Sequence, residues 1–295
     1  MARVLVAGCG YVGEAAANLF QEKGWDVEGW TGTAESAAKL SGGPYSVRAV
    51  DVTDRSAVSD APAEFEVVIH CVSSRGGDEK QYRRLYFDGA QNLLRAFPQA
   101  TLLFTSSTSV YAQLDGSVVD ESSPAEPHHE KGKILRETEQ LVLAAGGIVA
   151  RLGGIHGPQR SYFLTRFLEG THTGESNDRL INQVHRDDIV SALLLLADRR
   201  AHCQGEIFNV VADRPIQASV AREWLGTRLI EPGPTTFPSA TRERGTETGV
   251  EVRPRKRGVS NKQVSNRKLR ALGWEPRYPT FEVAMMESIL PSFGL

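Results

Sequence analysis

Short apolar segments alternate along the first half of the chain with longer segments whose apolar residues recur every three or four positions. This spacing predicts strands at 3–7, 27–30, 47–50, 67–72, 102–105 and 148–152, and helices at 12–23, 34–40, 81–97 and 134–143. Apolar strands that alternate with amphipathic helices are typical of a parallel sheet covered on both faces. We therefore expect an α/β fold with a doubly wound, Rossmann-type sheet.

The alternation weakens after about residue 153. A helix is still predicted at 189–197, a strand at 206–210 and helices at 266–272 and 281–290, whereas 232–262 is rich in Pro, Gly, Thr and Arg and has no periodicity. We expect two domains, an NAD(P)-binding domain of residues 1–154 plus 180–212, and a smaller α+β lobe of residues 155–179 plus 213–295.

Composition narrows the classes of partner. The 295 residues include 34 Lys and Arg against 36 Asp and Glu, for a formal net charge of −2. No global field then attracts nucleic acid or an anionic membrane, and the longest apolar run, 192–197, is too short to span a bilayer. Three scattered cysteines predict neither a disulfide framework nor a metal site. We expect a cytoplasmic protein with a small-molecule substrate.

A glycine-rich turn follows the first predicted strand and opens the first predicted helix. Gly8, Gly10 and Gly13 form the pattern G-x-G-x-x-G, with Tyr11 and Val12 inside it. Glycines in this place let the backbone amides at the helix N-terminus approach a pyrophosphate and let the helix pack closely on the sheet. The turn predicts a dinucleotide cofactor, and the alternative is a tight turn without a ligand.

The end of the second strand usually discriminates between the two nicotinamide cofactors, because a carboxylate there binds the ribose of NAD and repels a 2′-phosphate. Thr31, Gly32 and Thr33 occupy this place, and Lys39 is nearby. The absence of an acid favours NADP, with NAD as the alternative. Glu28 could be the missing acid, but it lies earlier in the strand, where we expect a solvated side chain.

Two residues after the third strand are candidates for the adenine end of the cofactor. Asp51 and Val52 could flank the adenine, or Asp51 could only cap the next turn.

With the glycine turn placed, further motifs follow in a defined order, at 68–73, 89–94, 104–111, 151–158, 184–189 and 208–210. Together they resemble the extended short-chain dehydrogenase/reductase family, which contains nucleotide-sugar epimerases and dehydratases. The resemblance implies that Cys71, Val72 and Ser73 line the cofactor. It leaves a monomer and a homodimer open.

The resemblance also implies an active site with a Ser at the end of the fifth strand and a Tyr-x-x-x-Lys on the next helix. Ser107 matches the serine, and Lys133 matches the lysine, with an acid four residues later. His129 stands in the place of the tyrosine. His129 is either an acid/base for a differently seated substrate or a sign that activity has lapsed. Tyr111 is either a substitute for the tyrosine or a packing residue under the cofactor.

Two cationic positions complete the candidates for the substrate side. Arg255 lies in a run of four cations within five residues, and Arg75 follows the fourth strand. Each could bind an anionic substrate group, such as the diphosphate of a sugar nucleotide, or point into solvent. We expect an NAD(P)-dependent oxidoreductase or nucleotide-sugar epimerase/dehydratase-like enzyme that acts on a hydroxyl or carbonyl group. The alternative is a catalytically lapsed NAD(P)-binding sensor or scaffold protein.

Overall fold

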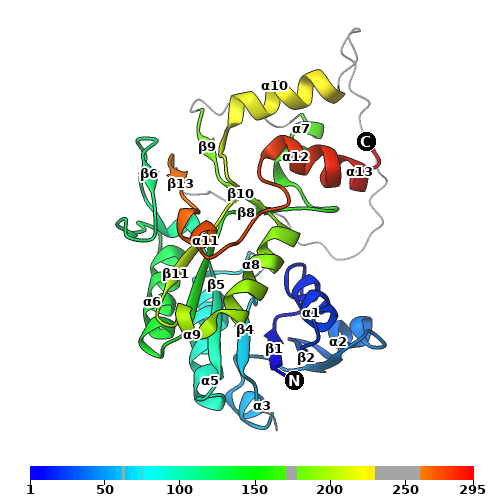
Figure 1. Ribbon diagram of the computed structural model, residues 1–295, viewed down its shortest axis with the longest axis vertical. Helices are drawn as coiled ribbons and strands as arrows, with labels where there is room; N and C mark the ends of the chain where they lie inside the picture. Colours follow the sequence, from blue (N-terminus) through cyan, green and yellow to red (C-terminus); the bar gives the residue numbers. More distant parts are fainter. Residues whose placement is uncertain (62–63, 75, 171–177, 230–259) are drawn as a thin grey trace.

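The computed structural model describes residues 1–61, 64–74, 76–170, 178–229 and 260–295. A seven-stranded sheet, in which every neighbouring pair is parallel, forms its centre (Figure 1). The strands lie in the order β3 (Ser46–Ala49), β2 (Asp26–Thr31), β1 (Arg3–Ala7), β4 (Val67–His70), β5 (Thr101–Ser107), β7 (Ile148–Leu152) and β11 (Ile207–Val210). The chain order changes direction between β1 and β4, so the doubly wound fold predicted from the sequence is confirmed.

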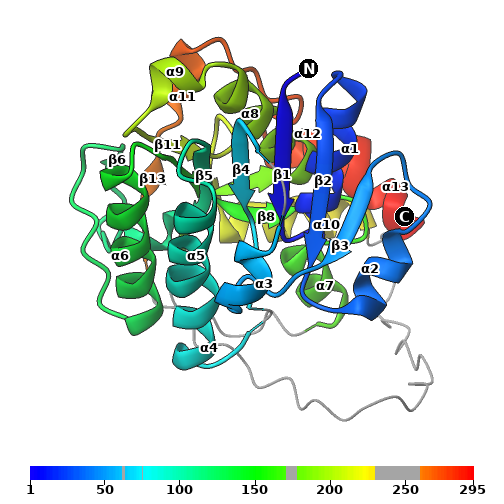
Figure 2. The same ribbon diagram turned by 90° about the horizontal axis from the view of Figure 1, so that it is seen from below.

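Helices cover both faces of this sheet. They are α1 (Gly13–Glu22), α2 (Ala34–Leu40), α3 (Arg55–Ser59), α4 (Glu79–Arg83), α5 (Gly89–Ala96), α6 (Glu130–Ala144), α8 (Arg186–Asp198), α9 (Arg200–Cys203) and α11 (Arg267–Ala271). One hydrophobic cluster joins the sheet to α1 and α8, and a second joins the opposite face to α5 and α6, which lie side by side (Figure 2). The sheet alternates its apolar side chains between these two clusters, as Val4 and Leu5 show.

A smaller part lies beyond the carboxyl edge of the sheet, because β7 runs almost directly into β8 (Gly154–His156) (Figure 1). Its helices are α7 (Tyr162–Leu168), α10 (Ala218–Leu229), α12 (Phe281–Ala284) and α13 (Leu290–Phe293), and its short strands are β8, β9 (Leu180–Ile181), β10 (Gln183–His185) and β12 (Ile216–Gln217). These helices share a third hydrophobic cluster, centred on residues such as Leu164, Leu225 and Phe281. Helix α10 was not predicted, because its apolar residues do not gather on one face of the sequence pattern.

The C-terminal segment returns to the larger part before it enters the smaller one. Strand β13 (Gln263–Val264) pairs with β6 (Val118–Val119), and Leu269 and Trp274 join the hydrophobic cluster of α1 and α8. The two-domain division remains a proposal, and these contacts place 263–274 with the sheet rather than with the lobe.

Two local features depart from the simple predictions. The helix expected at 81–97 contains a π-helical turn, η1 (Arg84–Asp88), between α4 and α5, and a second one, η3 (Met285–Ile289), separates α12 from α13.

Most of the non-periodic stretch 232–262 lies outside the described residues. In the part of the chain that the structure describes, no helix is long and apolar enough to cross a membrane.

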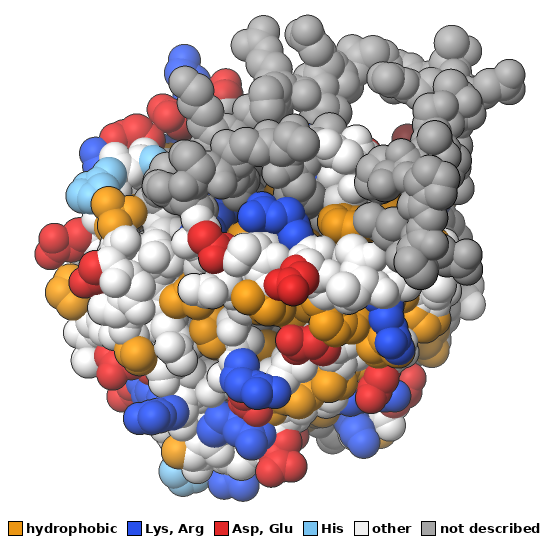
Figure 3. Space-filling model, turned by 90° about the horizontal axis from the view of Figure 1, so that it is seen from above, with side chains coloured by type: hydrophobic (Ala, Val, Ile, Leu, Met, Phe, Trp, Pro, Cys, Tyr) orange, Lys and Arg blue, Asp and Glu red, His pale blue; other side chains and the backbone are white. Residues whose placement is uncertain are grey.

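Charged side chains of both signs are interspersed on the face seen from above (Figure 3). That distribution matches the near-zero net charge of the chain.

Candidate dinucleotide-binding site

The glycine turn joins β1 to α1 at the carboxyl edge of the sheet. Gly8 has a positive φ of 106°, and a Cβ there would lie 2.7 Å from the backbone nitrogen of Val72. A Cβ at Gly13 would collide with the Gly8 carbonyl oxygen. Gly8 and Gly13 are therefore required by the backbone itself, since any side chain would push β4 or α1 away.

Gly10 has a different reason to be glycine. A Cβ at this position would meet no heavy atom of the described residues within 4 Å. No described atom of the protein fills the space beside Gly10, and a ligand phosphate would occupy it. Val12, the N-cap of α1, has no polar side chain to cap the helix; the Glu14 amide already donates to the Gly10 carbonyl at 2.8 Å, whereas the described residues give the Gly13 amide no partner, so this amide is available to an anion. The turn therefore fits a dinucleotide pyrophosphate.

The turn after β2 is the predicted ribose end of the site. Thr31 is buried and donates a hydrogen bond from Oγ1 to the Thr33 carbonyl, 3.1 Å away, while Thr33 Oγ1 caps α2 by accepting from the Ser36 amide. Gly32 between them is exposed. Lys39 pairs with Glu35 at 2.7 Å on the surface of α2. The lysine that favoured NADP therefore already has an anionic partner.

The burial of Glu28 contradicts the sequence-based expectation of a solvated side chain. Its side chain is not solvated but 7% exposed, and it accepts hydrogen bonds from Trp30 Nε1 (2.8 Å) and from Arg48 (3.3 Å). Arg3 lies 3.7 Å from its other oxygen. A strand position in the interior of a sheet buried on both faces hides even a carboxylate, provided that cations and an N–H donor satisfy it.

At the expected adenine end, Asp51 Oδ1 accepts a hydrogen bond from the Thr53 amide at 2.9 Å. This hydrogen bond is the one expected if Asp51 caps the turn after β3. Val52 is buried, and its carbonyl accepts from Asn92 Nδ2 at 2.9 Å.

Residues Cys71, Val72 and Ser73 leave β4 next to the glycine turn. Cys71 Sγ donates to the Gly8 carbonyl at 3.3 Å, and burial raises the pKa of this thiol above its usual range. The Ser73 side chain forms a hydrogen bond with the hydroxyl of Tyr86. All three segments of the predicted cofactor site on β1, β2 and β4 thus lie along one edge of the sheet.

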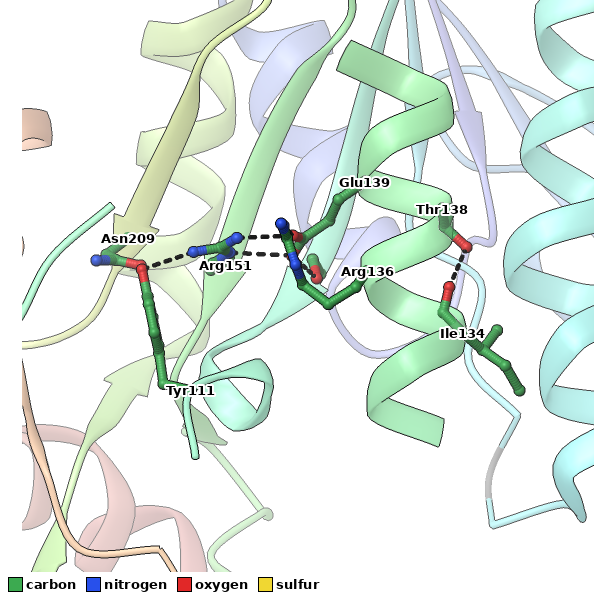
Figure 4. Close-up of polar contacts among 8 residues, drawn as sticks. Tyr111, Ile134, Arg136, Thr138, Glu139, Arg151 and Asn209 are labelled. Carbon is green, nitrogen blue, oxygen red and sulfur yellow. Dashed lines mark hydrogen bonds and ion pairs between the residues drawn. The ribbon is translucent and has the colours of Figure 1, made fainter. Parts of the chain in front are cut away.

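Two candidate catalytic residues lie near the end of β5. Ser107 Oγ accepts from the Ser109 amide at 3.1 Å and caps the 3-10 turn η2 (Thr108–Val110). Tyr111 is fully buried, donates to Asn209 Oδ1 at 2.9 Å and accepts from Arg151 at 2.8 Å (Figure 4). Burial also raises the pKa of Tyr111. These contacts are the ones that the packing alternative predicts for Tyr111, and its role in catalysis stays a prediction.

Tyr111 belongs to a buried polar network that sequence reasoning missed (Figure 4). The Arg151 guanidinium binds Glu139 through two hydrogen bonds of 3.0 and 2.7 Å, and both side chains are at most 1% exposed. Ser106 and Arg136 also bond to Glu139. The sequence does contain a signal for this network, which is Arg151 within the apolar strand 148–152. A charged side chain on such a strand needs a buried counter-charge.

The structure leaves both His129 and Lys133 exposed, away from the buried face of α6. His129 precedes α6 and caps it, since its Nδ1 accepts a hydrogen bond from the Gly132 amide at 2.9 Å. Lys133 is exposed and pairs with Glu130 at 2.6 Å. The buried face of α6 consists of Gly132, Ile134, Leu135, Thr138, Glu139 and Val142. The candidates Arg75 and Arg255 lie outside the described residues.

Comparison with known proteins identifies the family. A model of the NAD dependent epimerase/dehydratase family matches residues 4–211. The chain belongs to this family. The match runs from β1 past β11 and confirms the resemblance drawn from the motifs.

Individual relatives extend over most of the chain. Protein YeeZ of Escherichia coli (strain K12) is 31% identical over 226 residues, which cover 72% of this chain and 78% of YeeZ. A protein from Methylobacillus flagellatus, proposed to be an NAD-dependent epimerase/dehydratase, has a structure with a TM-score of 0.79 at 24% identity, covering 100% of this chain and 99% of that one. A UDP-glucose 4-epimerase from Thermotoga maritima, solved with UDP-glucose, gives a TM-score of 0.78 at 18% identity, with coverages of 99% and 98%. These two structures are similar to the chain in fold.

Proposed function

We propose that this chain binds a nicotinamide dinucleotide at the glycine turn and acts on a hydroxyl or carbonyl group of a small substrate, with a sugar nucleotide as one candidate. The observation that carries the proposal is that the three glycines of the turn differ in their surroundings. A side chain at Gly8 or Gly13 would collide with backbone atoms, whereas the space beside Gly10 is not filled by the described residues. The bound cofactor would supply or accept a hydride. NAD is the cofactor named by the family.

Preference for NADP stays a prediction. Thr31, Gly32 and Thr33 present no carboxylate to repel a 2′-phosphate, but Lys39 is paired with Glu35. The monomer or homodimer alternatives and a cytoplasmic location are also still predictions.

A specific observation supports the second candidate, a dinucleotide-binding protein without the tyrosine-and-lysine reaction. The hydroxyls of Ser107 and Tyr111, the His129 ring and the Lys133 ammonium all have partners within the protein. Glu139, rather than the surface acid Glu137, is the buried acid of α6. If it is the acid that follows the family's lysine by four residues, the lysine and tyrosine places belong to Leu135 and Lys131.

The test compares Gly10→Ala with Gly226→Ala, a matched control on α10 whose added Cβ also meets no described atom within 4 Å. We expect wild type and Gly226→Ala to bind NADH or NADPH equally well by calorimetry. Gly10→Ala should bind about tenfold more weakly or worse, with an unchanged thermal midpoint, because only the ligand meets the added methyl group.

Titration with both cofactors decides between NAD and NADP in the same experiment. Wild-type protein that is folded but binds neither, or a Gly10→Ala variant that binds like wild type, would overturn the proposed function.

A further inference from the structure

Two tyrosines and a lysine form a cluster beside the loop that follows β4. The rings of Tyr82 and Tyr86 lie 4.2 Å apart between centroids at an interplanar angle of 34°. Lys131, in the first turn of α6, places Nζ 5.5 Å from the centroid of the Tyr82 ring and donates a hydrogen bond to the Gly77 carbonyl at 2.6 Å. The ammonium therefore bridges α6, α4 and the β4 loop.

Tyr86 is the inner member of the cluster. Its hydroxyl forms hydrogen bonds with Ser73, Ser74 and Tyr82, and its backbone carbonyl lies 3.3 Å from His70 Nε2. Burial raises the pKa of Tyr86, while these hydrogen bonds oppose the rise. The residue stands in the π-helical turn η1, a kind of distortion that often marks functional positions. The Tyr86 hydroxyl thus has partners within the protein and stays protonated at neutral pH.

The position of this phenol follows from the topology of the sheet. The glycine turn lies between β1 and β4, and the turn that receives the ribose of the adenosine half follows β2. The other half of a dinucleotide must therefore extend over β4 and β5. Residues 71–74 connect the glycine turn to Tyr86. Val72 lies next to Gly8, and Ser73 and Ser74 form hydrogen bonds with Tyr86.

We propose that Tyr86 exchanges the proton with the substrate oxygen, and that Tyr82 and Lys131 are its positioning residues. The inference rests on the proposed function, and it assigns to Tyr86 the proton transfer for which α6 has no tyrosine. In carbonyl reduction the bound cofactor would supply the hydride to the carbonyl carbon, and the Tyr86 hydroxyl would give its proton to the carbonyl oxygen. The alcohol, the oxidised cofactor and a Tyr86 phenolate would result, and the phenolate would regain a proton from solvent. The cation of Lys131 stabilises that phenolate through Tyr82.

The test is an NMR titration of protein that carries ¹³Cζ-labelled tyrosine, with the Tyr86 resonance assigned through Tyr86→Phe. Oxidised NAD carries a positive nicotinamide and NADH a neutral one, so we expect NAD⁺ to weaken the proton affinity of Tyr86 about tenfold relative to NADH. Lys131→Met should strengthen that affinity in every state. Lys80→Met, which removes an exposed lysine from the same helix as Tyr82, should leave it unchanged.

Calorimetry on the same samples separates this inference from the proposed function. If both cofactors bind but the Tyr86 resonance titrates identically with NAD⁺ and NADH, or Lys131→Met has no more effect than Lys80→Met, the assignment of Tyr86 is overturned and dinucleotide binding stands. If neither cofactor binds to folded wild-type protein, the proposed function fails and the role of Tyr86 fails with it.

Discussion

Glu139 shows how much one residue can contribute when its partners are buried with it. Its carboxylate has no exposure and binds Arg151, which is 1% exposed. We expect Glu139→Gln to lower the free energy of unfolding by about 3–5 kcal/mol, because the guanidinium would keep a buried and uncompensated charge. Urea unfolding followed by circular dichroism measures the change.

Glu137→Gln is the matched control, two positions away on the same helix. Glu137 pairs with Arg83 at 2.6 Å, but both side chains are more than 40% exposed, so water screens the pair. Its loss should cost less than about 1 kcal/mol. Equal costs for the two glutamine variants would contradict the assigned importance of burial.

The start of helix α6 carries the prediction at the scale of an element. His129 caps the helix through Nδ1, so His129→Ala should lower the free energy of unfolding by about 0.5–2 kcal/mol. His129→Asp should restore most of the loss, since Asp is a good capping residue and also interacts favourably with the helix dipole.

The same two variants test the catalytic alternative for His129. Thermal unfolding gives the stability ranking, and dinucleotide titration gives binding. If His129→Ala were as stable as wild type, while both variants abolished turnover of a substrate that the wild type reduces, the capping interpretation would be wrong.

For the whole molecule, stability should fall as the pH falls below neutrality. Burial lowers the pKa of His70 to about 4, of His156 to about 3 and of His185 to about 4, against about 6.5 for an unfolded chain. The unfolded chain then binds more protons than the native state, so their contribution is complete above pH about 6.5 and is lost toward pH 4. Asp188 and Glu121 oppose them, because burial raises the pKa of Asp188 to about 6 and also raises that of Glu121. The three histidines outweigh these two carboxyl groups.

Urea unfolding at pH 7, 6 and 5 checks this sum. His156→Leu should flatten the profile and Asp188→Asn should steepen it, each by up to about 1.4 kcal/mol per pH unit. A profile that is flat in the wild type, or slopes that change in the same direction in both variants, would contradict it.

Features that depend on neighbours in sequence could be predicted from sequence alone. Strands β1 and β7 and helix α2 have the bounds that the apolar spacing predicted, and the glycine turn lies where the motif placed it. The reason is that apolar periodicity and glycine backbone freedom are properties of a few adjacent residues. The order of strand, turn and helix then specified the fold class, and the family match confirms it.

Features that depend on which groups meet across the fold were decided by tertiary structure. Glu28 is buried because Arg3 of β1 and Arg48 of β3 join Trp30 of its own strand around its carboxylate, and the sequence near Glu28 does not indicate either arginine. The burial of Leu135 and Glu139 against the sheet leaves Lys133 pointing outward. Successive residues of a helix point about 100° apart, so a motif spacing that is one residue off selects a side chain on another face, and spacing alone cannot say which lysine faces a cofactor.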